Sequence, residues 1–186
     1  SSVGSANFSL SIGGQNCTLS RTVDNGGGLY APGPGVSDIN GNSYATIIMN
    51  NGQEWMAENL RGTSYANGDP IPNVMDAVEW IGLTSGAWVH LDNDSQYDAS
   101  FGKLYNWYAV SDSRNVCPTN WHIPTDGEWH QLESALGMQV EDLGLTGSRG
   151  FTENVGGKLK ATTLWSSPNF NATNESGFTG YPGSQR

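Results

Sequence analysis

The stretch from Cys117 to Trp129, CPTNWHIPTDGEW, carries the strongest folding signal in this sequence of 186 residues. Thr125 is a good helix N-cap, and Glu128 follows three residues later, which is the spacing of a capping box. Pro124 before the cap and Trp129 after it are placed to form a hydrophobic staple. A helix is therefore predicted to begin directly after Thr125.

The residues that follow give this helix one apolar side and an end. Trp129, Leu132 and Leu136 are spaced three and four residues apart, so they share one face of a helix. Gly137 stands where the residue after a helix C-cap is often glycine. We expect one well-capped helix over about 125–136, with a structural role.

Composition excludes several classes of partner. Eighteen acidic and eight basic residues give a formal net charge of −10, which argues against binding to nucleic acid or to anionic lipid. No apolar run reaches the roughly 18 residues of a membrane span, so no membrane insertion is expected. The sequence contains 25 Gly, seven Trp and seven Tyr. Such a chain favours turns and short strands around aromatic anchors over long helices.

The composition also bears on location. Lys is scarce, whereas Asn, Ser, Thr and Gly are abundant, which is typical of an exported bacterial surface protein. The sequence begins at Ser1 without Met, so we interpret it as a processed or partial product. The expected location is extracellular or on the cell surface.

The first 37 residues differ from the rest. Apolar residues alternate with polar ones on both sides of Gly13-Gly14, which predicts a β-hairpin within 1–23. This hairpin is either an arm or the end of a preceding β-sandwich repeat. Residues 24–37 are rich in Gly and Pro and lack periodicity, so they are predicted to be a linker. A second hairpin is predicted from a strand over 44–49, a turn at 50–52 and a strand at 54–56.

From Asp38 onward the sequence resembles the Fibrobacter succinogenes major paralogous domain (FISUMP) family, found in secreted and surface proteins. Seven blocks occur in the family's order: 38–44 (DINGNSY), 53–61 (QEWMAENLR), 65–72 (YANGDPIP), 102–110 (GKLYNWYAV), 117–129 (CPTNWHIPTDGEW), 157–160 (GKLK) and 177–183 (GFTGYPG). The domain is assigned to 38–186. Family members usually continue with a Trp-Trp-Ser-Ser-Thr segment and closing strands, which this sequence lacks. Its sheet is therefore expected to have an open edge, which the hairpin or a neighbouring subunit's arm would cover by strand addition.

The block WHIPTDGEW at 121–129 also resembles a signature of formylglycine-generating enzymes and C-type-lectin-like folds. This resemblance implies an α+β fold: a loop-rich C-type-lectin-like domain with a small twisted antiparallel sheet, preceded by the β-hairpin arm.

Few residues suggest catalysis. The spacing of His122, Glu128 and His130 is not that of a metal-binding helix, and capping already explains Glu128, so these three residues are interpreted as structural. Nothing near Cys117 in the sequence lowers a thiol pKa. Cys17 and Cys117 are expected either to form a disulfide or to remain two buried thiols.

Two binding sites are considered. Asp92, Asn93, Asp94 and Asp98 carry oxygen ligands close together, so they form either half of a calcium site or a solvated acidic turn. The other site is a surface for sugar stacking, with Trp80, Trp88 and Trp165 as candidates because they lie outside regular motifs. Trp55, Trp107, Trp121 and Trp129 are expected to pack in the core.

The sequence therefore predicts a non-catalytic exported module for adhesion or extracellular assembly. Its expected partners are polysaccharide or neighbouring copies of the same chain, and calcium is the one cofactor considered. The first alternative is a structural subunit of an extracellular fibre completed by strand exchange. The second is an enzyme of the formylglycine-generating type, which the absence of a recognisable triad or metal cluster disfavours.

Overall fold

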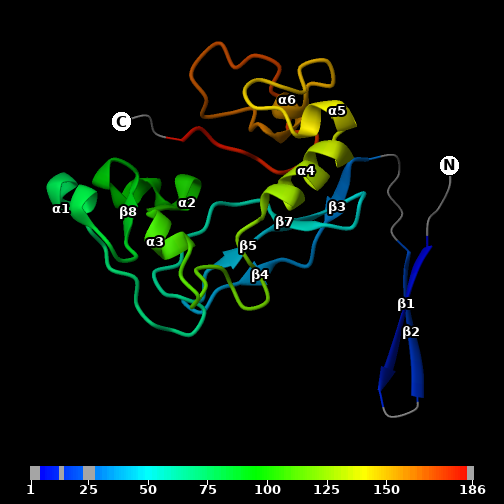
Figure 1. Ribbon diagram of the computed structural model, residues 1–186, viewed down its shortest axis with the longest axis horizontal. Helices are drawn as coiled ribbons and strands as arrows, with labels where there is room; N and C mark the ends of the chain where they lie inside the picture. The colour runs from blue at the N-terminus through cyan, green and yellow to red at the C-terminus, as the bar shows by residue number, and fades with distance from the viewer. Residues whose placement is uncertain (1–4, 13–14, 23–27, 184–186) are drawn as a thin grey trace.

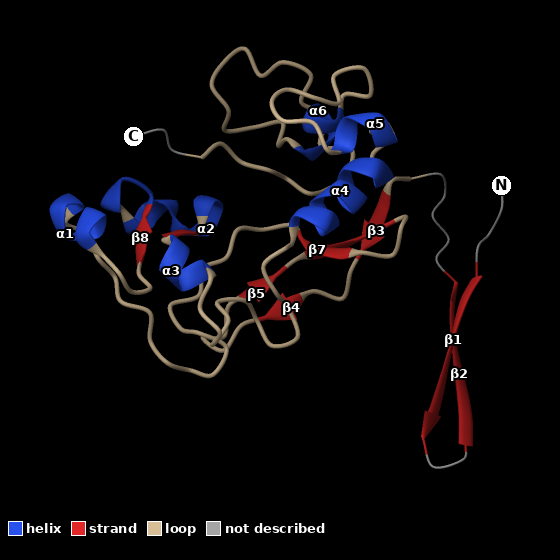
Figure 2. Ribbon diagram, in the orientation of Figure 1, coloured by secondary structure: helices blue, strands red, loops and turns tan. Residues whose placement is uncertain are grey.

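The protein is described here from a computed structural model, which describes residues 5–12, 15–22 and 28–183. Small antiparallel sheets and short helices make up these residues, as Figures 1 and 2 show. This mixture confirms the α+β class. The longest helix is α4, Asp126–Ala135, and no helix in the described ranges is both long and apolar enough to cross a membrane.

The predicted N-terminal hairpin is present. Strands β1 (Ser5–Ile12) and β2 (Gln15–Thr22) form a two-stranded antiparallel sheet in which Phe8 lies opposite Leu19 and Leu10 lies opposite Cys17. We call β1 and β2 together the hairpin arm (Figure 1).

The predicted linker over 24–37 is not a linker in its described part. β3 (Tyr30–Pro32) pairs with β6 (Thr46–Met49), and β4 (Val36–Ser37) pairs with β5 (Ser43–Tyr44). The prediction for residues 24–27 falls outside the described ranges. The Gly and Pro residues at 33–35 lie between the two short strands β3 and β4. Position 33 has no room for a side chain, because a Cβ on Gly33 would lie 2.7 Å from the Glu54 carboxylate.

The largest sheet has the order β3-β6-β7, with β7 (Glu54–Met56) at one edge. The turn between β6 and β7 contains Gly52 at φ 88°, a conformation that favours glycine. This confirms the second predicted hairpin. The strand expected over 44–49 is divided, however, because Tyr44 pairs in a different sheet from Thr46.

Helix α4 begins and ends where the sequence predicted. The Glu128 amide donates to Thr125 Oγ1 at 3.3 Å, and the Thr125 amide donates to Glu128 Oε2 at 2.7 Å, which completes the capping box. Gly137 follows the helix at φ 104°. Leu132 and Leu136 are fully buried, whereas Trp129 is 37% exposed.

Two apolar clusters form the core. The first joins the sheet β3-β6-β7 to α4 and α6 (Val155–Leu159), with Ile47, Trp55 and Leu132 among its members. The second surrounds Tyr65 and includes Ala109 and Cys117.

The remaining elements are short: α1 (Ala77–Gly82), β8 (Trp88–His90), 3-10 turns at Leu91–Asn93 and Ser95–Tyr97, α2 (Asp98–Phe101), β9 (Lys103–Tyr105), α3 (Trp107–Val110) and α5 (Val140–Leu143). Strand β8 pairs with β9.

The cap of α4 supplies the first testable prediction. Thr125→Ala removes the side-chain acceptor for the helix N-terminus and is expected to lower the free energy of unfolding by about 1 kcal/mol. Urea denaturation followed by circular dichroism measures the change. Thr163→Ala, at an exposed loop position, is the matched control, and an equal loss in both variants would contradict a specific capping role.

Candidate functional site

A groove of about 640 Å³ runs along β7 and the segment that follows it. Three other segments line it: the loop before α4, the start of α4, and the chain near the C-terminal end. The lining residues are 53–60, Cys117, 120–124, Glu128, Trp129 and 178–180. We call this feature the aromatic groove.

Three aromatic rings form one wall of the aromatic groove. The Trp55 and Trp129 ring centroids are 5.0 Å apart, and Phe178 lies 5.9 Å from Trp55 and 5.8 Å from Trp129. Trp55 is 7% exposed and belongs to the core, whereas Trp129 keeps part of its surface in the groove. The rings come from β7, α4 and the C-terminal segment, so they join three parts of the chain that are distant in sequence.

The backbone of β7 also faces this groove. Ile47 pairs with Trp55, the Met49 amide donates to the Gln53 carbonyl at 2.8 Å, and the Ala57 amide donates to the Ala45 carbonyl at 2.9 Å. Because an antiparallel ladder bonds alternate residues, the amide and carbonyl groups of Glu54 and Met56 point away from β6. No other strand in the described ranges pairs with this edge.

The groove is acidic. Its lining includes the acidic residues Glu54, Glu58 and Glu128, and no Lys or Arg is found among the described residues that line it. Glu54 accepts a hydrogen bond from the Thr46 hydroxyl at 2.6 Å, and Glu58 is 3.5 Å from Arg61. Hydrogen bonds from the Thr125 amide, from its hydroxyl and from His122 lower the pKa of Glu128 to about 2.

Cys117 is a free cysteine at the edge of the second core cluster, and it lines the groove. Burial raises the pKa of its thiol to about 11, so the nucleophilic thiolate is disfavoured at neutral pH. The side chain of Cys17 lies outside the described part of the chain, and the disulfide between the two cysteines stays a prediction.

The three residues predicted for sugar stacking lie on different parts of the fold, and sugar binding by them stays a prediction. Trp88 is partly buried and packs against the second core cluster, where its Nε1 donates to the Ile71 carbonyl at 2.8 Å and Lys103 Nζ lies 4.5 Å from its ring centroid. Trp80 lies on α1. Trp165 is 36% exposed and donates to the Gly180 carbonyl at 3.0 Å.

The roles expected for the other tryptophans are partly wrong. Trp107, expected in the core, is 73% exposed, because Asn106 caps α3 with its side chain and leaves the first residue of this one-turn helix outside. Trp129, also expected in the core, contributes to the groove. The sequence did contain a signal for the partial exposure of Trp129. Its place in the hydrophobic staple beside the capping box puts it at a helix end, where a side chain stays partly open.

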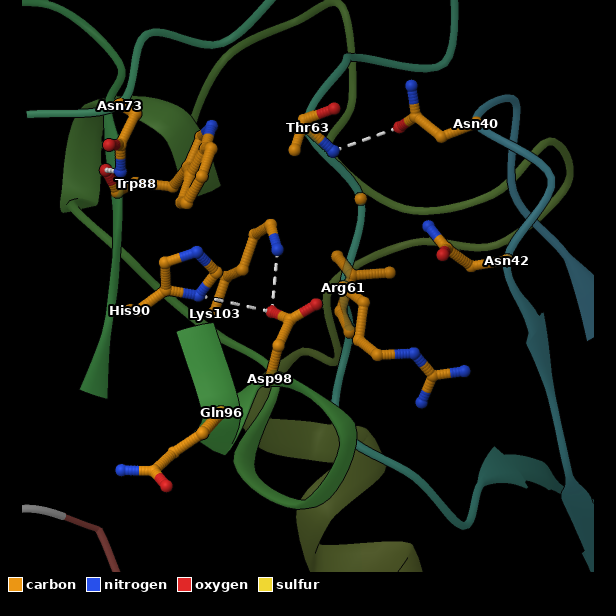
Figure 3. Close-up of polar contacts among 12 residues, drawn as sticks. Asn40, Asn42, Arg61, Thr63, Asn73, Trp88, His90, Gln96, Asp98 and Lys103 are labelled. Carbon is orange, nitrogen blue, oxygen red and sulfur yellow. Dashed lines mark hydrogen bonds and ion pairs between the residues drawn. The ribbon is translucent and has the colours of Figure 1, made fainter. Parts of the chain in front are cut away.

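The acidic stretch proposed as a calcium site directs its carboxylates apart. Asp98 accepts a hydrogen bond from Lys103 Nζ at 2.6 Å and lies 3.4 Å from His90 Nδ1, as Figure 3 shows. Asp94 accepts from the Gln96 amide and caps a 3-10 turn.

Asp92 and Asn93 both have positive φ, and the Asn93 amide group donates to the Met75 carbonyl. Within the described ranges no group of three or more His, Cys, Asp and Glu residues is placed to hold a metal ion. Calcium at this stretch stays a prediction.

The three residues weighed for catalysis lie at the start of α4. His122 Nε2 is 2.7 Å from Glu128, and His130 Nε2 is 3.6 Å from Asp126. Both histidines therefore pair with carboxylates of the first helical turn, which fits the structural role predicted for them.

Comparison with known families identifies the domain. The family model described as "Fibrobacter succinogenes major domain" matches residues 48–186. The chain therefore belongs to this family, as its sequence blocks predicted. No curated protein and no solved structure matches the chain. The family description names no activity. The aromatic groove is therefore the basis for the function proposed below.

The buried state of Cys117 predicts slow alkylation. In a Cys17→Ser background, the native protein at pH 8 should react with iodoacetamide about a hundredfold more slowly than the urea-unfolded chain, because burial raises the thiol pKa by about two units. Mass spectrometry measures both rates. Equal rates would mean that the Cys117 thiol is accessible and that its pKa is not raised.

The capping carboxylate predicts an acid-sensitive step. The folded pKa of Glu128, about 2, lies below its ordinary value of 4.5, so its stabilisation is complete above pH 4.5 and is lost as pH falls through 2. Glu128→Gln should therefore flatten part of the decline in stability between pH 4.5 and 2. Urea denaturation across this range tests it, with Glu141→Gln on exposed α5 as the control. A curve for Glu128→Gln parallel to the wild-type curve would contradict the assignment.

Proposed function

We propose that this chain is a non-catalytic, exported module for adhesion or extracellular assembly that binds an extended segment of polypeptide in the aromatic groove. The observation that carries the proposal is the unpaired edge of β7, which lies along an aromatic wall. An extended segment that pairs with Glu54 and Met56 extends the sheet by one strand, and its alternate side chains contact the rings. A C-type-lectin-like arrangement of the domain is part of this proposal.

Backbone pairing favours polypeptide over sugar. Unpaired amide and carbonyl groups at a sheet edge form a template for another strand, and proteins usually cover or blunt such an edge. The aromatic wall then supplies the apolar contact that makes the added strand stable in water, since two-stranded pairing alone is marginal.

Polysaccharide binding is the second candidate, and the partly exposed ring of Trp129 favours it. Aromatic faces pack against sugar rings, and the neutral and acidic side chains of the groove offer hydrogen bonds to hydroxyl groups. Sugar binding does not use the outward amide of Met56, so one substitution separates the two candidates.

The groove chemistry supports the non-catalytic assignment. The pKa of its thiol, Cys117, is raised by burial and by no charged neighbour. His122, a candidate base that also lines the groove, is paired with Glu128. A nucleophile needs an adjacent base or a lowered pKa, and this arrangement supplies neither.

The sharpest test replaces one backbone amide. Met56→Pro removes the N–H that points away from β6 and leaves the internal ladder intact, whereas Met56→Ala shortens the same side chain and keeps the N–H. An array of immobilised ten-residue peptides with alternating apolar and polar residues provides the probes. We expect the wild type and Met56→Ala to bind a subset of them and Met56→Pro to bind at least about tenfold more weakly.

Three controls complete this test. Trp129→Ala should weaken peptide binding, whereas Trp107→Ala, on exposed α3, should not. Affinity electrophoresis in gels that contain cellulose derivatives or xylan provides the sugar arm. Retardation that Trp129→Ala abolishes and Met56→Pro preserves would replace the peptide proposal with polysaccharide binding. Equal peptide binding by Met56→Pro and Met56→Ala would overturn pairing at the edge.

A further inference from the structure

The hairpin arm has one mainly apolar face, which also holds the positions of Gln15 and Arg21, and one polar face. In its register, Phe8 lies opposite Leu19 and Leu10 lies opposite Cys17, so these four positions share a face. The positions on the opposite face are all Ser, Asn or Thr: Ser5, Asn7, Ser9, Ser11, Asn16, Thr18, Ser20 and Thr22. An isolated two-stranded hairpin with such a face is marginal in water, and it gains stability by covering that face.

The aromatic groove complements this arm in three respects. Its β7 edge offers unpaired backbone groups, and its wall offers aromatic rings to an apolar face. Three glutamates are among its lining residues, and the arm has the opposite charge, because Arg21 is the only charged residue within strands β1 and β2. The unpaired edge, the aromatic wall and the charge of the groove therefore all suit the hairpin arm.

The sheet order indicates which copy of the arm fits. The arm precedes β3, and β3 and β7 are the two opposite edges of the sheet β3-β6-β7. In sequence, the arm therefore precedes the strand at one edge, whereas the unpaired strand is the other edge. A contact between unlike surfaces on two copies is heterologous, and repetition of it gives a fibre unless the rotation closes a ring.

We propose that the hairpin arm of a second copy of this chain is the occupant of the aromatic groove. This inference rests on the proposed function and names the partner that it requires. One strand of the arm pairs with β7, and the apolar face of the arm covers Trp55, Trp129 and Phe178. Each copy donates one arm and accepts another.

The two cysteines of the chain give this proposal an internal reporter. Cys17 occupies a position on the apolar face of the arm, and Cys117 lines the groove. Docking therefore brings one cysteine of each copy into the same region. Oxidised glutathione is a suitable trap: the two protein thiols lose two electrons and two protons to form one disulfide, and glutathione disulfide is reduced to two glutathione molecules.

The trapping experiment uses two full-length variants, Cys17→Ser and Cys117→Ser. Mixed together with oxidised glutathione, they should form a covalent dimer that runs at twice the chain mass without reductant. Peptide mapping should find Cys17 of one variant joined to Cys117 of the other. The wild type should give a ladder of larger species or a closed ring, because each copy can form two such links.

Two outcomes would overturn the proposal that the arm of a second copy occupies the aromatic groove. One is a mixture that forms no Cys17–Cys117 link. The other is a wild type that forms this link only within a monomer, which would place the arm in the groove of its own chain. In both cases binding of alternating peptides, lost in Met56→Pro, would still support the proposed function, so the two failures are distinguishable.

A non-covalent measurement uses matched changes on the two faces of β1. Leu10→Asp places a charge on the apolar face, and Ser9→Asp places the same charge on the polar face one residue away. Sedimentation velocity over a range of protein concentrations should show assembly for the wild type and Ser9→Asp and its loss for Leu10→Asp. A wild type that stays monomeric up to millimolar concentration, or equal assembly by the two variants, would contradict the proposal.

Discussion

The packing of Trp55 against Trp129 is the contact on which this domain most depends. Trp55 comes from an edge strand of three residues, and Trp129 comes from the first turn of the longest helix. Neither element is stable alone, since short strands and isolated helices of ten residues are marginal in water. Their rings, with Phe178 beside them, join the sheet, the helix and the C-terminal segment. The capping box then fixes where the helix begins, which sets the position of Trp129.

The sequence was informative where local chemistry determines structure. The capping box at Thr125 and the turn at Gly52 depend on hydrogen bonds and backbone angles within a few residues, so both could be predicted. Residues 30–37 could not, because their Gly and Pro content is typical of a linker. Their strands exist only through partners at 43–49, and such pairing is tertiary information. The same limit explains why the strand expected over 44–49 is shared between two sheets.

The candidate site was harder to predict than the fold. Trp88 was selected because it lies outside the regular motifs, yet its indole N–H finds the Ile71 carbonyl and its ring packs against a core cluster. Trp129 was assigned to the core because it lies inside a motif, yet part of its ring remains in the groove. Motif membership thus says little about exposure. The family resemblance predicted an open edge from missing C-terminal strands, which stays a prediction, and the position of the β7 edge beside three rings needed the strand order.

An open edge next to an apolar wall is costly for a domain, because it invites pairing with any exposed strand. In the proposed contact, the lining residues Glu54, Glu58 and Glu128 disfavour acidic segments, of which a chain with a net charge of −10 has many. The hairpin arm is not repelled in this way, because its strands carry Arg21 and no carboxylate. In the proposed assembly, attraction of Arg21 and repulsion of acidic segments act together, so the groove would select the arm without a deep specificity pocket.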